Sequence, residues 1–480
     1  MKRFAGLLLA GAVTAGCTLD PAYQRPAPPV PAAFPQGPSY PSLPSTAGGP
    51  SSSADGIAWS AFFTDQGLKA VIQQSLDNNR DLRLALDNIE QAEAQTATQR
   101  SALFPAVNAS GSEIYQQAPN TFVPGAGSFQ QRFYSASVGF SSWQLDLFGR
   151  VRSLTRAAAE QELAAEDNRR AVQISMVAQV ATAWYVYAAD QDFLAVARQT
   201  LAAQESSLSL IQARANAGIA SDLDLRQAET TVQQARSDVA NFTTNLAQAG
   251  NALDLLVGAP VDPSHLPKAL PLTGGVMDLQ PGLSSQVLLT RPDVRQAEHQ
   301  LLAANASIGA ARAAFFPQIG LTGQVGQEST ALERLFDAAS RTWLFQPSVS
   351  VPIFAGGRNV AGLKSAKAQR DAALAQYEKA IQSAFRDVAD ALARQGTIGQ
   401  QLAAQQGLAG SAQQALFLTT ARYERGTDPY LNVLVAQRTA YSAQQSLIST
   451  ALIRLTNAIS LYRALGGGER GPPGPPLSEN

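Results

Sequence analysis

Apolar and polar residues alternate in four short segments, near residues 106–116, 132–143, 318–327 and 342–353. In the second segment, serines and a glycine separate Tyr134, Ala136, Val138 and Phe140. Neighbouring side chains of a strand point to opposite faces, so each segment predicts a strand with one apolar and one polar face. Strands of ~10 residues with this pattern are typical of a water-filled membrane barrel, although alternation alone also fits a soluble sheet on a core. Aromatic residues near the strand ends favour the membrane, at Tyr115, Phe133, Trp143 and Trp343.

Four strands are too few to close a membrane barrel, because the smallest have ~8 strands. Open sheet edges are not tolerated in lipid, so several chains must combine their strands. Two chains would supply eight strands and three chains twelve. The sequence therefore predicts a mainly α fold with a β-barrel segment that is shared between copies.

Two very long helices are predicted by what their segments lack. Residues 151–217 contain neither glycine nor proline, and residues 355–428 contain no proline. At 1.5 Å per residue such a helix reaches about 100 Å, far more than a globular domain needs. Apolar residues recur every seven positions in the first segment, as in a coiled coil, at Val180, Tyr187, Leu194, Leu201 and Leu208. Gly218 and Pro429 mark where each long helix ends and the chain reverses.

One stretch inside the first long helix has the length of a bilayer span. Residues 171–189 carry no charged side chain, and a transmembrane helix needs about 20 apolar residues. Polar residues within the stretch and the continuing heptad pattern argue against that alternative. We therefore expect a buried packing segment.

The sequence nearly repeats itself at a spacing of 208 to 212 residues. Residues 81–105 resemble residues 293–317, and residues 214–228 resemble residues 422–436. The second pair shares Arg214 with Arg422, Gly218 with Gly426, and Leu223 with Leu431. Each half predicts helix, two strands, a very long helix, a turn and a further helix, so one structural unit is duplicated.

The N-terminus has the pattern of a secretory signal that ends at a lipidation site. Lys2 and Arg3 precede an apolar run, and small residues lead to Cys17, the only cysteine. The segment resembles a bacterial lipobox with Thr14 where leucine is usual, and Thr18 after the cysteine implies retention in the outer membrane. An ordinary cleaved signal is the alternative.

These features divide the chain into six parts. We expect a signal peptide (1–16), a lipidated and extended Pro/Ser-rich segment (17–56), a first repeat (57–260) with a helix hairpin over 151–256, a linker (261–290), a second repeat (291–466) with a hairpin over 357–465, and a disordered tail (467–480).

Composition argues against several classes of function. The formal net charge of -1 makes nucleic acid an unexpected partner. His265 and His299 are the only histidines and Cys17 is assigned to lipid, so the sequence has no catalytic or metal-ligating constellation. The glycines within residues 354–359 lack the lysine of a phosphate-binding loop and fit a strand-to-helix corner. We expect no enzyme activity, no metal and no cofactor, and any energy source must lie on another protein.

Five stretches of sequence form a recognisable set. They are CTLDPAYQRP (17–26), WQLDLFGRVRS (143–153), RPDVRQAEHQLLAANASIGAARAAFFP (291–317), VPIFAGGR (351–358) and RYERGTDPYLNVLVAQR (422–438). Together they resemble the NodT/OprM branch of the TolC outer-membrane efflux family, and the resemblance extends from Trp59 to about Leu465.

The resemblance implies a homotrimer with a shared twelve-stranded barrel in the lipid of the outer membrane. A periplasmic α-helical barrel continues it, with an equatorial belt built from the chain ends and residues 260–289. It further implies the exit duct of a tripartite system with a periplasmic membrane-fusion adaptor and an inner-membrane efflux transporter. Family members dock the adaptor at the helix tips, and the matching positions are Gly218 and Gly426.

The family's closed periplasmic aperture is ringed by a leucine and, one helical turn later, an aspartate. Leu431 matches the leucine, whereas Val435 stands at the aspartate position. Acidic residues near the tips can supply negative charge and basic ones can pair with them to hold the gate shut; these are Asp222, Asp224, Asp428, Arg422 and Arg425. Ordinary helix capping is the alternative role for the acids.

Three other functions stay open at this point. The same architecture serves type I protein secretion, which the adaptor and pump partners would distinguish from drug efflux. A coiled-coil envelope lipoprotein that does not transport is a second alternative, against which the polar strand faces argue. An enzyme with a hidden site is the third, and the shortage of histidine and cysteine argues against it.

Overall fold

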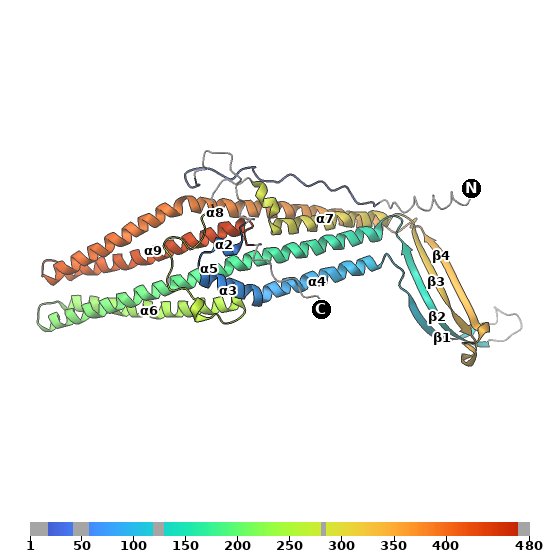
Figure 1. Cartoon of the computed structure of the whole chain (residues 1–480), viewed down its shortest axis with the longest axis horizontal. Coiled ribbons are helices and arrows are strands. Elements are labelled where there is room, and N and C mark those ends of the chain that lie inside the picture. The colour runs from blue at the N-terminus through green and yellow to red at the C-terminus, as the bar shows by residue number, and fades with distance from the viewer. Residues whose placement is uncertain (1–17, 42–56, 119–128, 280–284, 469–480) are drawn as a thin grey trace. The chain divides into compact units, whose positions relative to one another are not determined.

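The computed structural model describes residues 18–41, 57–118, 129–279 and 285–468. It is mainly helical, with one four-stranded antiparallel sheet (Figure 1). Cys17 and most of the C-terminal tail lie outside the described residues. The chain forms two compact units: unit 1 contains residues 1–27, 88–166 and 296–377, and unit 2 the remainder. Both units take segments from both repeats, so the duplication does not coincide with the compact units.

The two repeats predicted from the sequence contain helices of matching length. Helices α4 (Arg80–Ser101) and α7 (Pro292–Ala313) both have 22 residues, and α5 (Arg150–Asn216) and α8 (Arg358–Glu424) both have 67. Helices α6 (Asp222–Val257) and α9 (Tyr430–Ala464) have 36 and 35 residues. The remaining elements are short: α2 (Trp59–Phe62), α3 (Gln66–Asn78), η3 (Pro263–His265), η4 (Ser285–Thr290), η5 (Leu332–Arg334) and η6 (Ala338–Ser340).

The sheet of unit 1 joins the strand pairs of the two repeats. Its order is β1 (Asn108–Ala118), β2 (Phe129–Leu145), β3 (Gln318–Ser329) and β4 (Arg341–Ser350). The four strands lie where the alternation predicts them, and β2 is longer at both ends. Within the described residues, β1 and β4 each have one edge without a partner strand.

The two faces of the sheet differ as predicted. Val138, Val325 and Trp343 lie side by side on neighbouring strands and are 49%, 57% and 76% exposed. On the other face serine hydroxyls meet across the β1–β2 pair, with Ser110 and Ser137 3.0 Å apart. The residues that the structure describes leave this apolar sheet face uncovered, which argues against the alternative of a soluble sheet packed on its own core.

A β-bulge interrupts the simple alternation of apolar and polar residues near the end of β2. Phe140 pairs with Gly323 and Trp143 with Leu321, so β2 has one extra residue between these pairs. Ser142 has φ 54° and its N–H donates to the Thr322 hydroxyl at 3.1 Å. A strict period of two would place Trp143 on the polar face, whereas the bulge returns it to the face of Phe140, whose ring it meets edge-on at 6.4 Å.

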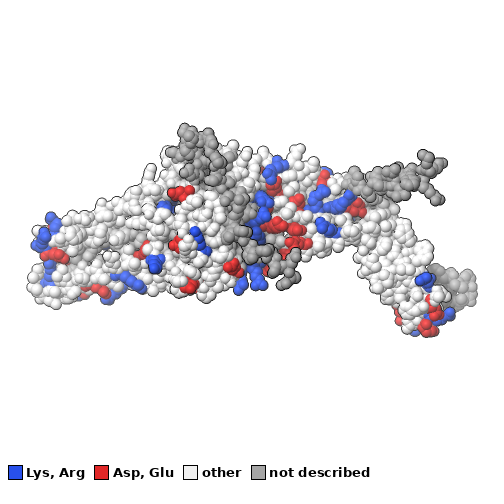
Figure 2. Space-filling model, in the orientation of Figure 1, with Lys and Arg blue, Asp and Glu red and all other residues white. Residues whose placement is uncertain are grey.

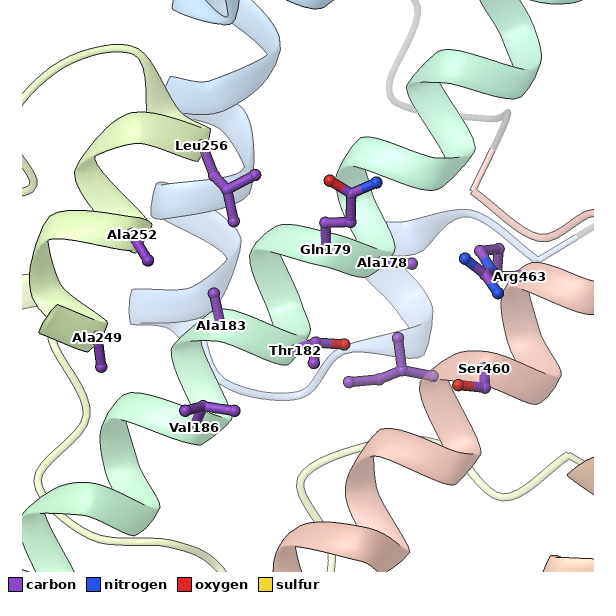
Figure 3. A pocket seen from close by; sticks show the side chains of 11 residues that line it. Ala178, Gln179, Thr182, Ala183, Val186, Ala249, Ala252, Leu256, Ser460 and Arg463 are labelled. Carbon is purple, nitrogen blue, oxygen red and sulfur yellow. The ribbon is translucent and has the colours of Figure 1, made fainter. Parts of the chain in front are cut away.

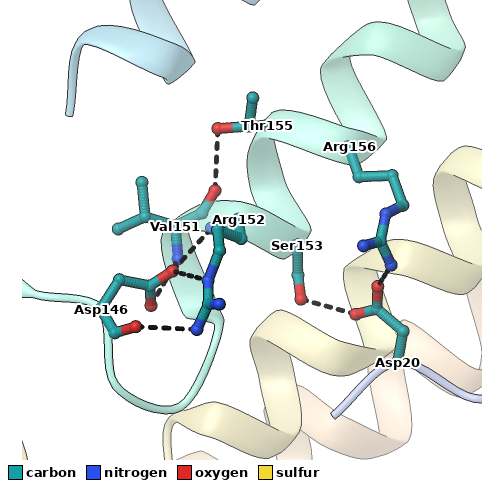
Figure 4. Close-up of polar contacts among 7 residues, drawn as sticks. All are labelled: Asp20, Asp146, Val151, Arg152, Ser153, Thr155 and Arg156. Carbon is teal, nitrogen blue, oxygen red and sulfur yellow. Dashed lines mark hydrogen bonds and ion pairs between the residues drawn. The ribbon is translucent and has the colours of Figure 1, made fainter. Parts of the chain in front are cut away.

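Asp146 turns the chain from β2 into α5 (Figure 4). Its carboxylate accepts hydrogen bonds from the Val151 and Arg152 backbone N–H groups at 3.1 and 2.9 Å. The Arg152 guanidinium donates to the same carboxylate and to the Asp146 carbonyl. A carboxylate at a helix start satisfies free N–H groups and favours the helix dipole, so this aspartate fixes where the 67-residue helix begins.

The predicted coiled-coil seam of α5 is correct in its period but shifted in position. Val180 and Leu194 are buried, whereas Leu201 and Leu208 are only partly buried. The most buried residues beyond Leu194 are Ala197, Gln204 and Ile211, which also recur every seven residues. Alanine and glutamine are not strongly hydrophobic, so the leucines predicted the stripe of the helix next to the one that is buried.

The uncharged stretch 171–189 packs inside unit 2, as expected. Val180, Ala181 and Tyr185 are fully buried, and the Tyr185 hydroxyl donates to the Gly275 carbonyl at 3.0 Å. In the described ranges, no helix has the length and apolar character that a membrane crossing needs.

Residues near the start of the first repeat meet the end of the second repeat in unit 2. The Phe62 ring stacks on Tyr462 with centroids 4.0 Å apart, and the Tyr462 hydroxyl donates to the Ile57 carbonyl at 2.6 Å. Phe63 forms an isolated bridge with Val276, which brings in the linker between the repeats. Segments from the first repeat, the linker and the second repeat therefore form one packed region.

Replacing Tyr185 with phenylalanine tests this packing. The change removes one of the two hydrogen bonds that the half-buried Gly275 carbonyl accepts, while the Thr64 N–H still donates to it at 3.3 Å, so the free energy of unfolding should fall by about 1 kcal/mol. Denaturant titration of the purified protein measures it. Tyr187→Phe is the control, since no hydrogen bond of the Tyr187 hydroxyl is found in the described part of the chain; equal effects of both changes would contradict the assignment.

Candidate gate at the helical tips

The turns that end α5 and α8 have the same hydrogen-bond pattern. Gly218 has φ 73° and Gly426 has φ 76°. The Ile219 N–H donates to the Arg214 carbonyl at 2.9 Å, and the Thr427 N–H donates to the Arg422 carbonyl at 3.0 Å. This is the Schellman ending, which needs a left-handed residue and favours glycine. Both glycines are exposed, with no atom within 4 Å of the position that a side chain would enter.

The acids that begin α6 have local roles. The Ser221 hydroxyl accepts from the Asp224 N–H at 3.1 Å and donates to the Asp224 carboxylate at 2.8 Å, within a capping box. Asp222 lies exposed in the same first turn. The geometry of Asp224 thus corresponds to the capping alternative.

Arg422 and Asp428 form a two-pronged ion pair across their own turn. The Arg422 Nε and Nη2 each donate to one carboxylate oxygen at 2.8 Å. The hydrogen bonds from Arg422 hold the pKa of Asp428 below its ordinary value, and the same contacts raise the pKa of Arg422. The pair closes the α8–α9 turn instead of linking one hairpin to the other. Arg425 is exposed beside it.

Arg214 is the repeat equivalent of Arg422 and reaches the opposite hairpin. Ala220 stands at the position that corresponds to Asp428, so Arg214 has no carboxylate in its own turn. Its guanidinium lies over the Tyr423 ring at 4.7 Å, and its Nη2 donates to the Glu424 carbonyl at 3.4 Å. This contact was not predicted from the sequence, although Ala220 in place of the aligned Asp428 is a signal that the sequence contains.

An apolar cluster joins the two hairpins of the chain below these turns. It is formed by Ile211 of α5, Leu225 and Ala228 of α6, and Tyr430, Val433 and Leu434 of α9. Burial raises the pKa of Tyr430 to about 12. Leu431 and Val435, in contrast, are 55% and 57% exposed. Four residues apart on α9, they share a face that this cluster does not cover.

Leu223 is a further exposed apolar residue at the tips. It is the repeat equivalent of Leu431 and is 65% exposed at the start of α6. Both repeats therefore present a leucine at the same place after the turn. The alignment of the repeats paired these leucines, but only the second was expected to act in the gate.

A cavity of about 470 Å³ between α5, α6 and α9 has little reactive chemistry (Figure 3). Small and apolar side chains line it, including Thr182, Ala183 and Ala252, and Arg463 is its one ionisable lining residue. A pocket with one isolated charge offers no pair of groups for acid, base or nucleophilic chemistry.

The two histidines occupy separate, ordinary environments. His299 Nδ1 lies 2.7 Å from a Glu160 carboxylate oxygen in unit 1. The His265 carbonyl accepts from the Trp184 indole at 3.1 Å in unit 2. Among the residues that the structure places, no group of three or more His, Cys, Asp or Glu side chains is arranged to hold a metal ion.

The visible charges are unevenly distributed. Figure 2 shows a largely uncharged surface over the sheet strands, whereas acidic and basic side chains lie at the loop end of the sheet, at the helical tips and over the helices. The class of protein follows from these features: a duplicated, mainly α, TolC-like chain with an uncovered apolar sheet face and paired helical hairpins.

Comparison with known proteins agrees with this class. The outer membrane efflux protein family model matches residues 71–259 and 283–467. The chain is 45% identical to the probable efflux pump outer membrane protein TtgC of Pseudomonas putida over 97% of this chain and 96% of that protein. The chain belongs to the outer membrane efflux protein family.

Solved structures show the same fold. A membrane protein from Pseudomonas aeruginosa is 40% identical, with a TM-score of 0.86 over 94% of this chain and 98% of that one. The open state of the MtrE outer membrane channel of Neisseria gonorrhoeae is 35% identical, with a TM-score of 0.83 over 95% and 99%.

The Arg422–Asp428 pair generates a prediction with a defined pH dependence. Because the pKa of Asp428 is lower in the folded state, its pairing with Arg422 stabilises the turn fully at pH values above the unpaired aspartate pKa of about 3.9. This stabilisation is lost as the pH falls through the folded-state pKa. Hydrogen exchange of residues 423–429, corrected for the intrinsic effect of pH, should not change between pH 7 and 5. Asp428→Asn should accelerate it at both pH values, whereas Asp222→Asn should not. Loosening of the wild-type turn already at pH 5 would contradict the pairing.

Proposed function

We propose that three copies of this chain form the exit duct of a tripartite efflux pump in the outer membrane. The duct passively conducts small amphiphilic compounds that a periplasmic adaptor and an inner-membrane pump deliver. The observation that carries this proposal is the uncovered apolar face of a sheet with two unpaired edges, within a chain that belongs to the efflux family. Lipid and neighbouring copies are the surroundings that satisfy such a sheet.

The proposed number of copies follows from strand arithmetic and from the family. Each chain contributes four strands, and three chains contribute twelve. A barrel of that size leaves a water-filled interior, whereas about eight strands leave space for side chains alone. The polar face, with rows of serine, glycine and glutamine, suits that interior. Catalysis has no part in the proposal, and the energy comes from the inner-membrane partner.

The helical tips are proposed as both gate and adaptor site. Gly218 and Gly426 leave their turns open, so a partner hairpin can approach the backbone closely. Leu431, followed by Val435 one turn later, is proposed to line the constriction as an apolar ring. Arg422 and Asp428 then act indirectly, by keeping the α8–α9 turn rigid, while Asp222, Asp224 and Arg425 surround the mouth with charge.

Cys17 is proposed as a second membrane attachment. Acylation of this sole cysteine would place lipid chains at the mature N-terminus, in addition to the barrel. The mass of the purified protein tests it directly, because lipidation removes residues 1–16 and adds acyl mass to Cys17.

Single-channel conductance in planar bilayers tests the duct and its gate together. Wild-type protein should insert as uniform steps of low conductance. Leu431→Ser should raise conductance on the order of twofold or more, because a polar ring no longer excludes water from the constriction. Leu408→Ser is the matched control, an exposed leucine on α8 away from the tips. Absence of conductance from folded, inserted protein of every form would overturn the proposal.

Arg214→Ala tests whether contact between the hairpins keeps the tips together. The change removes the guanidinium from the Tyr423 ring and the Glu424 carbonyl, so the hairpins of each chain should separate more readily and open-channel events should become more frequent. Arg226→Ala removes an exposed ion pair to Glu229 on the same hairpin and serves as control. The contact has no gating role if both variants behave like wild type.

A further inference from the structure

Residues 19–25 follow the proposed lipidation site and lie along helix α7 in unit 1. The Leu19 carbonyl accepts from the Arg312 guanidinium at 2.9 Å, and the Pro21 carbonyl accepts from the Asn305 amide at 2.8 Å. Both donors come from α7, so the helix binds the backbone of this segment. We call residues 19–25 the strap.

Asp20 connects the strap to a second helix (Figure 4). Its carboxylate accepts from the Ser153 hydroxyl at 2.5 Å and pairs with the Arg156 guanidinium, both on α5. The Asp20 side chain is 8% exposed and Ser153 is fully buried. A carboxylate removed from water needs such partners, and removing either side of the contact leaves an unsatisfied group.

Gly309 makes room for this carboxylate on α7. A methyl group at Gly309 would overlap the Asp20 carboxylate and lie 2.8 Å from the Ser153 hydroxyl oxygen. Alanine is the better helix former by about 1 kcal/mol, so a glycine inside α7 needs a reason. The approach of Asp20 supplies one.

The other end of the strap is held by Glu298. The Arg25 guanidinium donates to both Glu298 carboxylate oxygens at 2.6 Å, and the Tyr23 hydroxyl donates at 3.1 Å. The Glu298 side chain is 9% exposed. The strap-binding residues of α7 recur at helical spacing on one side of the helix, at Glu298, Asn305, Gly309 and Arg312.

We propose that the strap is a fixed mount for the lipid anchor, with Asp20 as its positioning residue. Asp20 is three residues from Cys17, so the two Cα atoms lie within about 11 Å. Ser153 lies in the first turn of α5, which follows β2, and Arg312 in the last turn of α7, which precedes β3. The mount therefore holds the anchor at the junctions between strands and helices.

The role in the membrane rests on the proposed lipidation of Cys17. The sheet and the acyl chains would enter the same bilayer, and two attachments cooperate only if their spacing matches. A fixed mount sets that spacing, whereas a loose Pro-rich tether would let the anchor move over tens of ångströms.

Two substitutions on opposite sides of the contact test the mount in the full-length protein. Asp20→Ala removes the carboxylate, and Gly309→Ala displaces it while favouring α7 itself. Each should speed hydrogen exchange of residues 19–25 about tenfold. Gly362→Ala is the matched control, a helical glycine of unit 1 with no atom within 4 Å of the added methyl.

The double variant separates positioning from general damage. Once Asp20 is alanine, the methyl at Gly309 meets no carboxylate, so the double variant should release the strap no further than Asp20→Ala alone. The unfolding temperature of Gly309→Ala should change little, because alanine favours α7 by about 1 kcal/mol and offsets the lost contact between Asp20 and Ser153. A role limited to stability would give strap release only together with a lower unfolding temperature. Unchanged strap exchange in both single variants, or additive effects in the double variant, would overturn the mount.

A spin label at Ala22→Cys reports on position in the membrane. An acylated Cys17 thiol cannot react, so the label enters only the exposed Ala22 site. In phosphatidylethanolamine–phosphatidylglycerol vesicles the label should be immobile, and mobile after Asp20→Ala. Mass spectrometry separates the two claims: a protected strap without acyl mass would overturn the lipid anchor and its mount, whereas acyl mass with a mobile strap would overturn the mount alone.

Discussion

The structure depends on one constraint: a sheet whose edge N–H and C=O groups must be paired before it can lie in lipid. The described residues pair β1 with β2, β2 with β3 and β3 with β4, which leaves the outer edges of β1 and β4 without a partner strand in this part of the chain. Its own helices do not cover the apolar face that includes Val138 and Trp343. A single copy therefore leaves hydrogen-bonding groups unpaired at both edges. In the proposed ring of copies, neighbouring strands pair these edges and lipid covers the apolar face.

The two repeats contain the same kinds of helices and strands, but single substitutions between them give aligned residues different contacts. Aligned arginines at the two tips illustrate this, because Arg422 has Asp428 in its own turn while Arg214 faces Ala220 and contacts the other hairpin instead. Aligned strand ends differ likewise: Asp146 caps α5, whereas Phe354 stands at the corresponding place before α8. One repeat thus stiffens its turn, and the other joins the hairpins together.

The sequence predicted the features that local patterns encode. Strand positions, helix lengths and the turns at Gly218 and Gly426 follow from period, missing glycine or proline, and left-handed helix endings. It did not predict contacts between distant segments. The bulge before Trp143 depends on pairing with the neighbouring strand, and the buried seam at Ala197 depends on packing against neighbouring helices. The strap depends on contacts of Asp20 with residues more than 100 positions away. None of these features produces a hydrophobic pattern in the sequence. The roles of Leu431 and the acids at the tips stay predictions, since they concern an assembled aperture.

Cross-linking of the open strand edges tests the central claim most directly. Single cysteines placed along β1 and along β4, scanned in pairs across the register within assembled outer membranes, report which strands are neighbours. The account predicts disulfides between β1 of one copy and β4 of another, with products that end at three chains. Disulfides confined to single chains, or no β1–β4 pair in protein that is correctly inserted, would contradict it.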